Sequence, residues 1–301
     1  MLNRAWVRRT AKRWVKETEY LRALQLPWPD SRLWFRRPGT LPSFLIVGAQ
    51  RAGTTFLHDK ILSETNAECS PLQKEVHFFD NKYYRSLEWY KKFFVSVENV
   101  DKINFETSPY YLYHPAVPKR VANSIPNVKL IVVLRDPLDR AISHYKWMRQ
   151  SGLESRNAVD AFKYDAGLIE LEFNPSYLKK FVNPLHFDYD HIYRSYIRRS
   201  LYHIQLKRWL EYFEPRDVLI LSSSYIFNRP KNAINKISSS IGLRYSESKR
   251  KESPNKNQSR SGISVSKKAR EVAQKYLQGV ESKVKEIITD EMILEESLSF
   301  K

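Results

Sequence analysis

Short apolar segments alternate with amphipathic segments along most of the chain. Runs of apolar residues typical of buried strands occur at 43–47, 103–106, 128–134 and 217–221. Apolar residues recur with helical spacing over 54–65, 137–150, 191–213, 230–241 and 266–288. Strands that alternate with helices predict an α/β domain, in which helices flank a central, mostly parallel sheet.

The two ends of the chain differ from this middle part. Residues 1–40 form a basic extension with ten Lys/Arg and three acidic residues, and its apolar residues have roughly helical spacing. Such a helix either packs on the outside of the domain or lies on an anionic membrane surface. We expect the domain itself over 41–290 and a C-terminal tail over 291–301. Residues 246–264, rich in Ser, Lys, Asn and Arg, predict a loop.

Composition narrows the possible partners without choosing among them. The formal net charge of +18 favours a polyanion: a nucleic acid, an acidic glycan, an anionic membrane or a phosphate-rich cofactor. The single cysteine, Cys69, excludes an intramolecular disulfide and a cysteine-based zinc site. Neither a run of about 18 apolar residues nor a secretory signal occurs, so we expect a cytoplasmic protein or one peripheral to a membrane.

The first candidate site is the segment 48–55, Gly-Ala-Gln-Arg-Ala-Gly-Thr-Thr, between a predicted strand and a predicted helix. The two glycines have the spacing of a phosphate-binding loop, which makes the domain P-loop-like. A nucleotide triphosphatase would have Lys at Thr54, whereas here the basic residue is Arg51 within the loop. A strand-to-helix turn without a ligand is the alternative. The residues assigned to anion binding are Gln50, Arg51, Ala52, Gly53, Thr54 and Thr55.

A second candidate anion site follows the strand at 128–134. Arg135 stands at the carboxyl end of this strand, where parallel sheets bind ligands, and Ser143 lies about two helical turns further on. Asp136 and Pro137 suit the start of the intervening helix. Arg135 and Ser143 can hold a second phosphate. Alternatively, Arg135 forms an ion pair with Asp139 and Ser143 is solvated.

These two segments together resemble a known family. Residues 44–55 resemble the 5′-phosphosulfate loop of sulfotransferases that use 3′-phosphoadenosine 5′-phosphosulfate (PAPS), and residues 130–145 resemble their 3′-phosphate site. Residues 74–80, Lys-Glu-Val-His-Phe-Phe-Asp, and 87–90 resemble the branch that sulfates carbohydrates, including heparan sulfate sulfotransferases. The likeness covers roughly residues 42 to 280 and weakens after 240.

The resemblance implies roles for individual residues. Glu75 matches the family's general base, and His77 is a second catalytic or substrate-orienting group. Arg51 is the third catalytic residue: it stands where most members have Lys, and it stabilises charge on the oxygen that bridges the sulfate and the 5′-phosphate. Thr107 is a further departure, because relatives often have Lys there. The remaining assignments are cofactor binding for Tyr202 and for a basic flap that includes Arg260, Ser261 and Gly262, and substrate binding for Lys74 and Ser108.

The expected reaction is an in-line transfer of the sulfuryl group from PAPS to a hydroxyl or amine of a carbohydrate, leaving PAP and needing no metal. The sequence leaves the carbohydrate acceptor open, and an acidic polysaccharide and a lipid-linked sugar are both compatible with it. One alternative is a P-loop nucleotide kinase, against which the absence of Lys after Gly53 argues. The other is a non-catalytic protein that binds polyanions or anionic surfaces, although the sequence has no recognised nucleic-acid motif.

Overall fold

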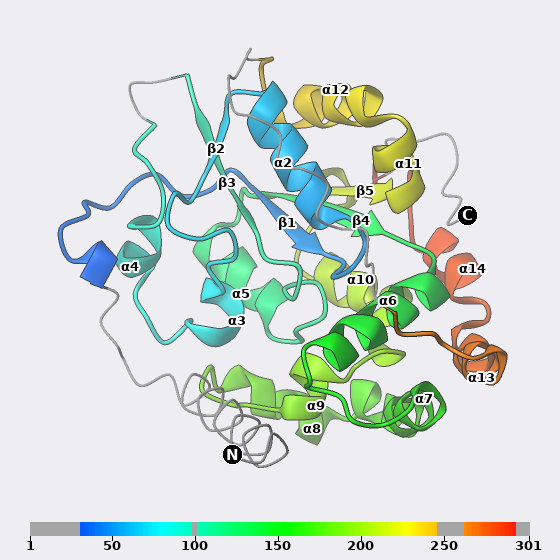
Figure 1. Cartoon of the computed structure of the whole chain (residues 1–301). Helices are drawn as coiled ribbons and strands as arrows, with labels where there is room; N and C mark the ends of the chain where they lie inside the picture. Colours follow the sequence, from blue (N-terminus) through cyan, green and yellow to red (C-terminus); the bar gives the residue numbers. More distant parts are fainter. Residues whose placement is uncertain (1–30, 98–100, 246–261, 293–301) are drawn as a thin grey trace, which may run out of the picture.

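A five-stranded parallel sheet forms the centre of the protein, whose computed structural model describes residues 31–97, 101–245 and 262–292 (Figure 1). Its strands lie in the order β2-β3-β1-β4-β5. They are β1 (Phe44–Gly48), β2 (Ala67–Cys69), β3 (Ile103–Thr107), β4 (Lys129–Leu134) and β5 (Val218–Ser222). The α/β class, the parallel sheet and four of the strands are as the apolar runs predicted. The short edge strand β2 carries no such run and was missed.

Helices cover both faces of this sheet. The α-helices that precede β5 are α2 (Thr54–Glu64), α3 (Phe78–Asn81), α4 (Leu87–Lys91), α5 (Val117–Ser124), α6 (Pro137–Gln150), α7 (Ala158–Ala166), α8 (Pro175–Lys179), α9 (Tyr189–Tyr193) and α10 (Tyr202–Leu210). Those that follow it are α11 (Ser223–Asn228), α12 (Pro230–Ile241), α13 (Lys267–Leu277) and α14 (Val280–Lys285). Helices α2, α11 and α12 lie on one face, whereas α5, α6 and α10 lie on the other (Figure 1).

Six short 3-10 helices occur among the described residues. They are η1 (Ser31–Leu33), η2 (Ile169–Phe173), η3 (Lys180–Val182), η4 (Arg198–Ser200), η5 (Pro215–Asp217) and η6 (Asp290–Met292). None of the described helices is both long and apolar enough to cross a membrane.

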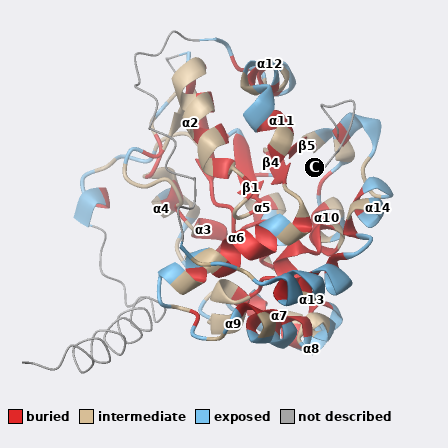
Figure 2. Cartoon of the chain, turned by 45° about the vertical axis from the view of Figure 1, so that its right-hand side comes forward, coloured by how far each residue is buried: buried red, intermediate tan, exposed pale blue. Residues whose placement is uncertain are grey.

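The hydrophobic core lies between the sheet and these helices. Every residue of β1 and β5 is buried, as expected of strands covered on both faces. Buried residues also run along the inner sides of α6 and α10 (Figure 2). The connection from β1 leads towards β2 on one side of the sheet, and that from β4 leads towards β5 on the other. The carboxyl ends of β1 and β4 therefore form a topological switch point, where open α/β sheets bind ligands.

The helix predicted over 191–213 is wrong in its first half. The chain forms α9, then η4, and only α10 is a regular helix of more than two turns. Between them the backbone N–H groups of Ile197 and Arg198 donate to the carboxylate of Asp165, and the buried Arg198 pairs with the same carboxylate at 2.7 Å. A side chain from a distant helix thus replaces the helical acceptors, which periodicity within the segment cannot reveal.

The helix predicted over 266–288 is also interrupted. Gly279 adopts a φ of 77° between α13 and α14, and this left-handed conformation is favourable for glycine and ends the first helix. The predictions for residues 1–30, for most of the loop at 246–264 and for the tail beyond 292 fall outside the described residues.

Candidate active site

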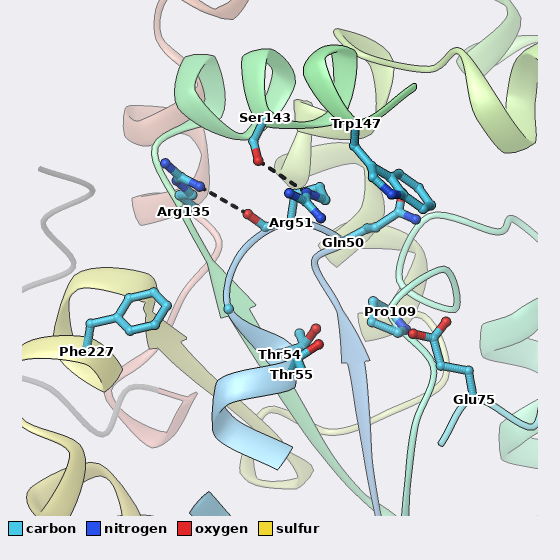
Figure 3. Close-up of a pocket in the computed structure, with 11 residues that line it drawn as sticks. Gln50, Arg51, Thr54, Thr55, Glu75, Pro109, Arg135, Ser143, Trp147 and Phe227 are labelled. Carbon is cyan, nitrogen blue, oxygen red and sulfur yellow. Dashed lines mark hydrogen bonds between the residues drawn. The ribbon is translucent and has the colours of Figure 1, made fainter. Parts of the chain in front are cut away.

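A cleft opens at the switch point, at the carboxyl ends of β1 and β4 (Figure 3). Its walls come from the loop after β1, the start of α2, the segment before α3, the loop after β3, helix α6 and helix α11. The residues that line it are Gln50, Arg51, Gly53, Thr54, Thr55, Glu75, Pro109, Arg135, Ser143, Trp147 and Phe227. The structure therefore brings both predicted anion sites and the predicted general base into one cleft.

The loop after β1 leaves the first backbone N–H groups of α2 without a side-chain cap. Gly53 stands at the N-cap with a φ of 99°, and a Cβ there would lie 2.9 Å from the Phe227 ring. In contrast, the side chain of Asp136 caps α6 by accepting from Asp139 N at 2.7 Å, as the sequence predicted. Uncapped N–H groups and the helix dipole favour an anion at the start of α2.

Arg51 and Arg135 bring two positive charges to the same wall. Arg51 Nε donates to Ser143 Oγ at 3.2 Å, and its guanidinium lies 5.7 Å from the centre of the Trp147 ring (Figure 3). Arg135 Nη1 donates to the backbone oxygen of Arg51 at 3.4 Å. Burial, and next the charge of Arg135, lower the pKa of Arg51. Two neighbouring cations without a carboxylate between them suit a multiply charged anion.

The alternative ion pair of Arg135 with Asp139 exists but is weak. Its closest atoms are 3.8 Å apart, and both side chains are exposed to solvent. Such exposed pairs contribute little to stability. Arg135 therefore lines the cleft although Asp139 lies nearby. Tyr202 supports Arg135 from behind, because its hydroxyl donates to the backbone oxygen of Arg135 at 3.0 Å. Tyr202 itself is fully buried and does not line the cleft.

Glu75 lines the cleft on the opposite wall from the two arginines, and the predicted catalytic residue His77 lies beside Glu75 without lining the cleft itself. His77 Nε2 is 3.3 Å from Glu75 Oε2, and His77 Nδ1 is 2.7 Å from a carboxylate oxygen of the buried Asp80. Burial alone would lower the pKa of His77, but the charge and hydrogen bond of Asp80, followed by those of Glu75, raise it to about 10. These two carboxylates therefore favour the protonated form of His77.

Lys74 and Ser108 do not line the cleft as predicted substrate contacts. Lys74 Nζ donates to Thr55 Oγ1 at 2.6 Å, so it joins the segment before α3 to the start of α2. Burial lowers its pKa, although nearby acidic groups partly oppose this. Ser108 is fully buried, and its hydroxyl donates to Glu106 at 2.5 Å. A serine at the end of a strand can face either way, and here Glu106 draws its hydroxyl inwards.

Other sequence-predicted residues lie behind or outside the cleft. Ala52 is buried, and its backbone N–H donates to the oxygen of Ala49 at 3.1 Å within the loop. Gly262 is exposed and is absent from the cleft lining, while Arg260 and Ser261 fall outside the described residues. At position 107, where relatives often have Lys, Thr107 is buried and its hydroxyl hydrogen-bonds His58 Nδ1 at 2.9 Å.

The sequence analysis missed four residues that shape the cleft. Trp147 lies one helical turn after Ser143 on α6, so the spacing could have revealed it. Phe227 belongs to α11, a helix without a clear pattern in the sequence. Pro109 follows β3. The fully buried Arg199 hydrogen-bonds Gln50 Oε1 and thereby orients the Gln50 amide at the cleft, a contact across 149 residues that no local signal predicts.

Among residues 31–97, 101–245 and 262–292, no three His, Cys, Asp or Glu side chains group as a metal site would require. The described lining of the cleft offers cations, backbone N–H groups and one carboxylate. Such a site can hold a charged leaving group on one wall and accept a proton on the other.

Comparison with known proteins agrees with this geometry. The heparan sulfate N-deacetylase/N-sulfotransferases 4 of Mus musculus and 3 of Homo sapiens are 29% and 30% identical over 232 residues, which is 73% of this chain and 25% of each relative. The heparan sulfate glucosamine 3-O-sulfotransferase 6 of Mus musculus is 28% identical over 72% of this chain and 59% of its own length. This chain thus spans about a quarter of the first two relatives.

The fold also occurs in a solved structure. The sulfotransferase from Alicyclobacillus acidocaldarius superposes with a TM-score of 0.60 at 21% identity, covering 83% of this chain and 96% of its own. The sulfotransferase domain model matches residues 41–291, most of the chain. The family match confirms the family expected from the two anion-site motifs. The chain belongs to the sulfotransferase domain family.

Proposed function

We propose that the protein transfers the sulfuryl group of PAPS to an amine or hydroxyl of a carbohydrate. The observation that carries this proposal is the convergence of two anion sites and one carboxylate in a single cleft. PAPS has two phosphate-bearing ends, which match two separate cationic sites better than a single phosphate would. In nucleotide kinases a lysine after the second glycine of this loop reaches the β- and γ-phosphates of the triphosphate. Thr54 stands at that position here, so the loop fits a phosphosulfate better than a triphosphate.

The wall with Arg51 would hold the donor. The uncapped N–H groups at Thr54 and Thr55 and the Arg51 guanidinium would bind the 5′-phosphate, while Arg135 and Ser143 would bind the 3′-phosphate. The exposed ring of Phe227 at the rim would offer a stacking surface for the adenine. As the bond to the acceptor forms, the S–O bond of PAPS breaks and its electron pair stays on the phosphate oxygen of PAP, where Arg51 stabilises the charge.

Glu75 would accept the proton that the acceptor amine or hydroxyl loses. Its carboxylate lines the cleft, whereas the raised pKa of His77 favours its protonated form, which pairs with Glu75 at 3.3 Å. These contacts support the roles that the resemblance implies, with Glu75 as the general base and His77 as an orienting group. His77 orients one carboxylate oxygen, and Glu75 is the base.

The acceptor class follows from the charge of the protein and from its relatives. The relatives named above act on heparan sulfate, one on the glucosamine 3-hydroxyl and others as N-sulfotransferases. The net charge of +18 favours an acidic polysaccharide over a neutral one. We therefore propose a glucosamine-containing acidic polysaccharide as acceptor, sulfated at nitrogen or oxygen.

Two experiments test this function. Calorimetry should detect binding of PAP that ATP with Mg²⁺ does not replace. Mass spectrometry should then detect sulfate transfer from PAPS to heparosan with free amino groups or to N-sulfated heparosan. If the folded protein does not bind PAP, the proposal is wrong. If it binds PAP but modifies neither probe, the donor assignment stands and the proposed acceptor is wrong.

The base is tested by Glu75→Gln. We expect kcat to fall by about 100-fold or more, in the range typical of general bases, with PAP affinity unchanged. Glu88→Gln is the matched control, since Glu88 is an exposed residue of α4 that pairs with Lys91 away from the cleft. A Glu75→Gln variant as active as the control would show that another group accepts the proton.

We also propose that the basic extension of residues 1–40 makes a peripheral contact with an anionic membrane; the structure describes its residues 31–40. Trp34 and Phe35 expose 62% and 94% of their surfaces, beside the exposed Arg37. Arg36 holds this turn in place by donating to Lys92 O at 2.8 Å. Aromatic side chains flanked by arginines favour the interface of an anionic bilayer. Trp34→Ala combined with Phe35→Ala should weaken sedimentation with phosphatidylserine vesicles, and unchanged binding would contradict this contact.

A further inference from the structure

A buried carboxylate behind the cleft holds the segment that carries Glu75 and His77. Glu106 is fully buried at the end of β3, and Glu106 Oε1 accepts from Val76 N at 3.1 Å and from Tyr111 OH at 2.9 Å. Ser108 donates to the same oxygen and Tyr90 to the other. Four donors converge on this one side chain, which does not line the cleft and takes no part in the chemistry described above.

Tyr111 extends this network to the start of α3. Its hydroxyl accepts from Phe78 N at 2.8 Å and from Phe79 N at 3.3 Å, while it donates to Glu106. Burial, and next the charge of Glu106, raise the pKa of Tyr111 well above its usual value, so the phenol keeps the proton that it donates. The first two N–H groups of α3, whose N-cap residue His77 provides no side-chain cap, thus have an acceptor.

His77 lies between these two attachments in an unfavourable backbone conformation. Its φ is 58°, in the left-handed region that costs a non-glycine residue free energy. Val76 before it is held directly by Glu106, and Phe78 after it is held through Tyr111. The left-handed turn places His77 Nε2 beside Glu75 and His77 Nδ1 beside Asp80.

We propose that Glu106 and Tyr111 are positioning residues for the reaction, which clamp the backbone on both sides of His77 and so keep the Glu75–His77 pair aimed at the cleft. The effect on the reaction rate rests on the proposed function, whereas the effect on the backbone around His77 does not. Without the clamp, His77 would relax towards negative φ and its ring would leave Glu75. An error of about 1 Å in the placement of a catalytic group is enough to lower the rate strongly.

The chain offers a matched pair of variants to test the clamp. Tyr111→Phe and Tyr90→Phe each remove one buried hydroxyl that donates to Glu106, but only that of Tyr111 also accepts from the backbone at α3. Both should lose thermal stability, and Tyr111→Phe should lose more because it also leaves the N–H groups of Phe78 and Phe79 without this acceptor. We expect Tyr111→Phe alone to lower kcat, by about 10-fold or more, with PAP affinity unchanged. Tyr90→Phe should stay within about 3-fold of wild type, since it disturbs only the carboxylate.

A second readout does not depend on activity. NMR titration of the His77 ring, assigned with a His77→Gln variant, should show its pKa falling from about 10 towards the ordinary value in Tyr111→Phe but not in Tyr90→Phe. Should Tyr111→Phe fail to fold, Glu106→Asp tests the same link, because it keeps the charge and withdraws the oxygen from Val76. The proposal is overturned if the His77 pKa and kcat of the Tyr111→Phe or Glu106→Asp protein match wild type, or if Tyr90→Phe has equal effects. A wild type without PAPS-dependent transfer would instead refute the proposed function.

Discussion

Replacement of Arg51 by glycine or by alanine should separate the catalytic role of this residue from its effect on stability. Arg51 adopts a φ of 71°, which is unfavourable for any residue with a Cβ. Both variants lose the hydrogen bond to Ser143 and the contact with Trp147, so these losses cancel in a comparison of the two. Only alanine retains the conformational cost.

The expected difference follows from two opposing terms. A left-handed conformation costs alanine about 1–2 kcal/mol. The unfolded state of the glycine variant is more flexible, which lowers its stability relative to the alanine variant by about 0.4–1 kcal/mol. Arg51→Gly should therefore be more stable than Arg51→Ala by about 1 kcal/mol, which corresponds to roughly 2–4 °C in Tm for a domain of this size. Both should lose about 100-fold or more in kcat, because the developing charge on the leaving oxygen loses its principal cation.

Differential scanning calorimetry and steady-state sulfation assays measure these two quantities. Arg51→Lys is the control for charge, and it should retain more activity than either variant while lacking the planar guanidinium. If Arg51→Ala were as stable as Arg51→Gly, the argument from the left-handed backbone would be wrong. If Arg51→Gly kept kcat within a few-fold of wild type, the loop N–H groups alone would stabilise the leaving phosphate.

Two further perturbations test the charges on either wall. Arg135→Ala should weaken PAP binding by about 10-fold to 100-fold in calorimetry, as for a lost charge-assisted contact, whereas Asp139→Ala should leave it unchanged or tighter. On the other wall, the pKa of His77 is raised in the folded state, so its stabilising effect is complete below about pH 6.5 and is lost as the pH rises towards 10. Asp80→Asn removes the carboxylate that contributes most to the raised pKa of His77. The urea midpoint of this variant should therefore fall less between pH 6.5 and pH 9.5 than that of wild type. An equal fall in both proteins would assign the pH dependence to other groups.

The sequence alone determined the elements whose chemistry is local. The loop after β1 and the residues Arg135 and Ser143 were found because glycine spacing, strand ends and helix caps are properties of adjacent residues. The parallel sheet followed from apolar runs, since a strand buried on both faces must be apolar throughout. Glu75 was assigned through resemblance to the family, and the structure places it in the same cleft.

Only the tertiary structure decided which groups act from a distance. The side chain of Asp165 interrupts a helix that periodicity favoured, and Glu106 turns Ser108 away from the cleft. The buried Asp80 raises the pKa of His77, an effect that the spacing of the two residues in the sequence did not reveal. In each case a buried carboxylate pairs with the groups that the fold brings next to it, because an unpaired buried charge would destabilise the protein strongly. Such pairings follow from proximity in space, which spacing along the chain does not encode.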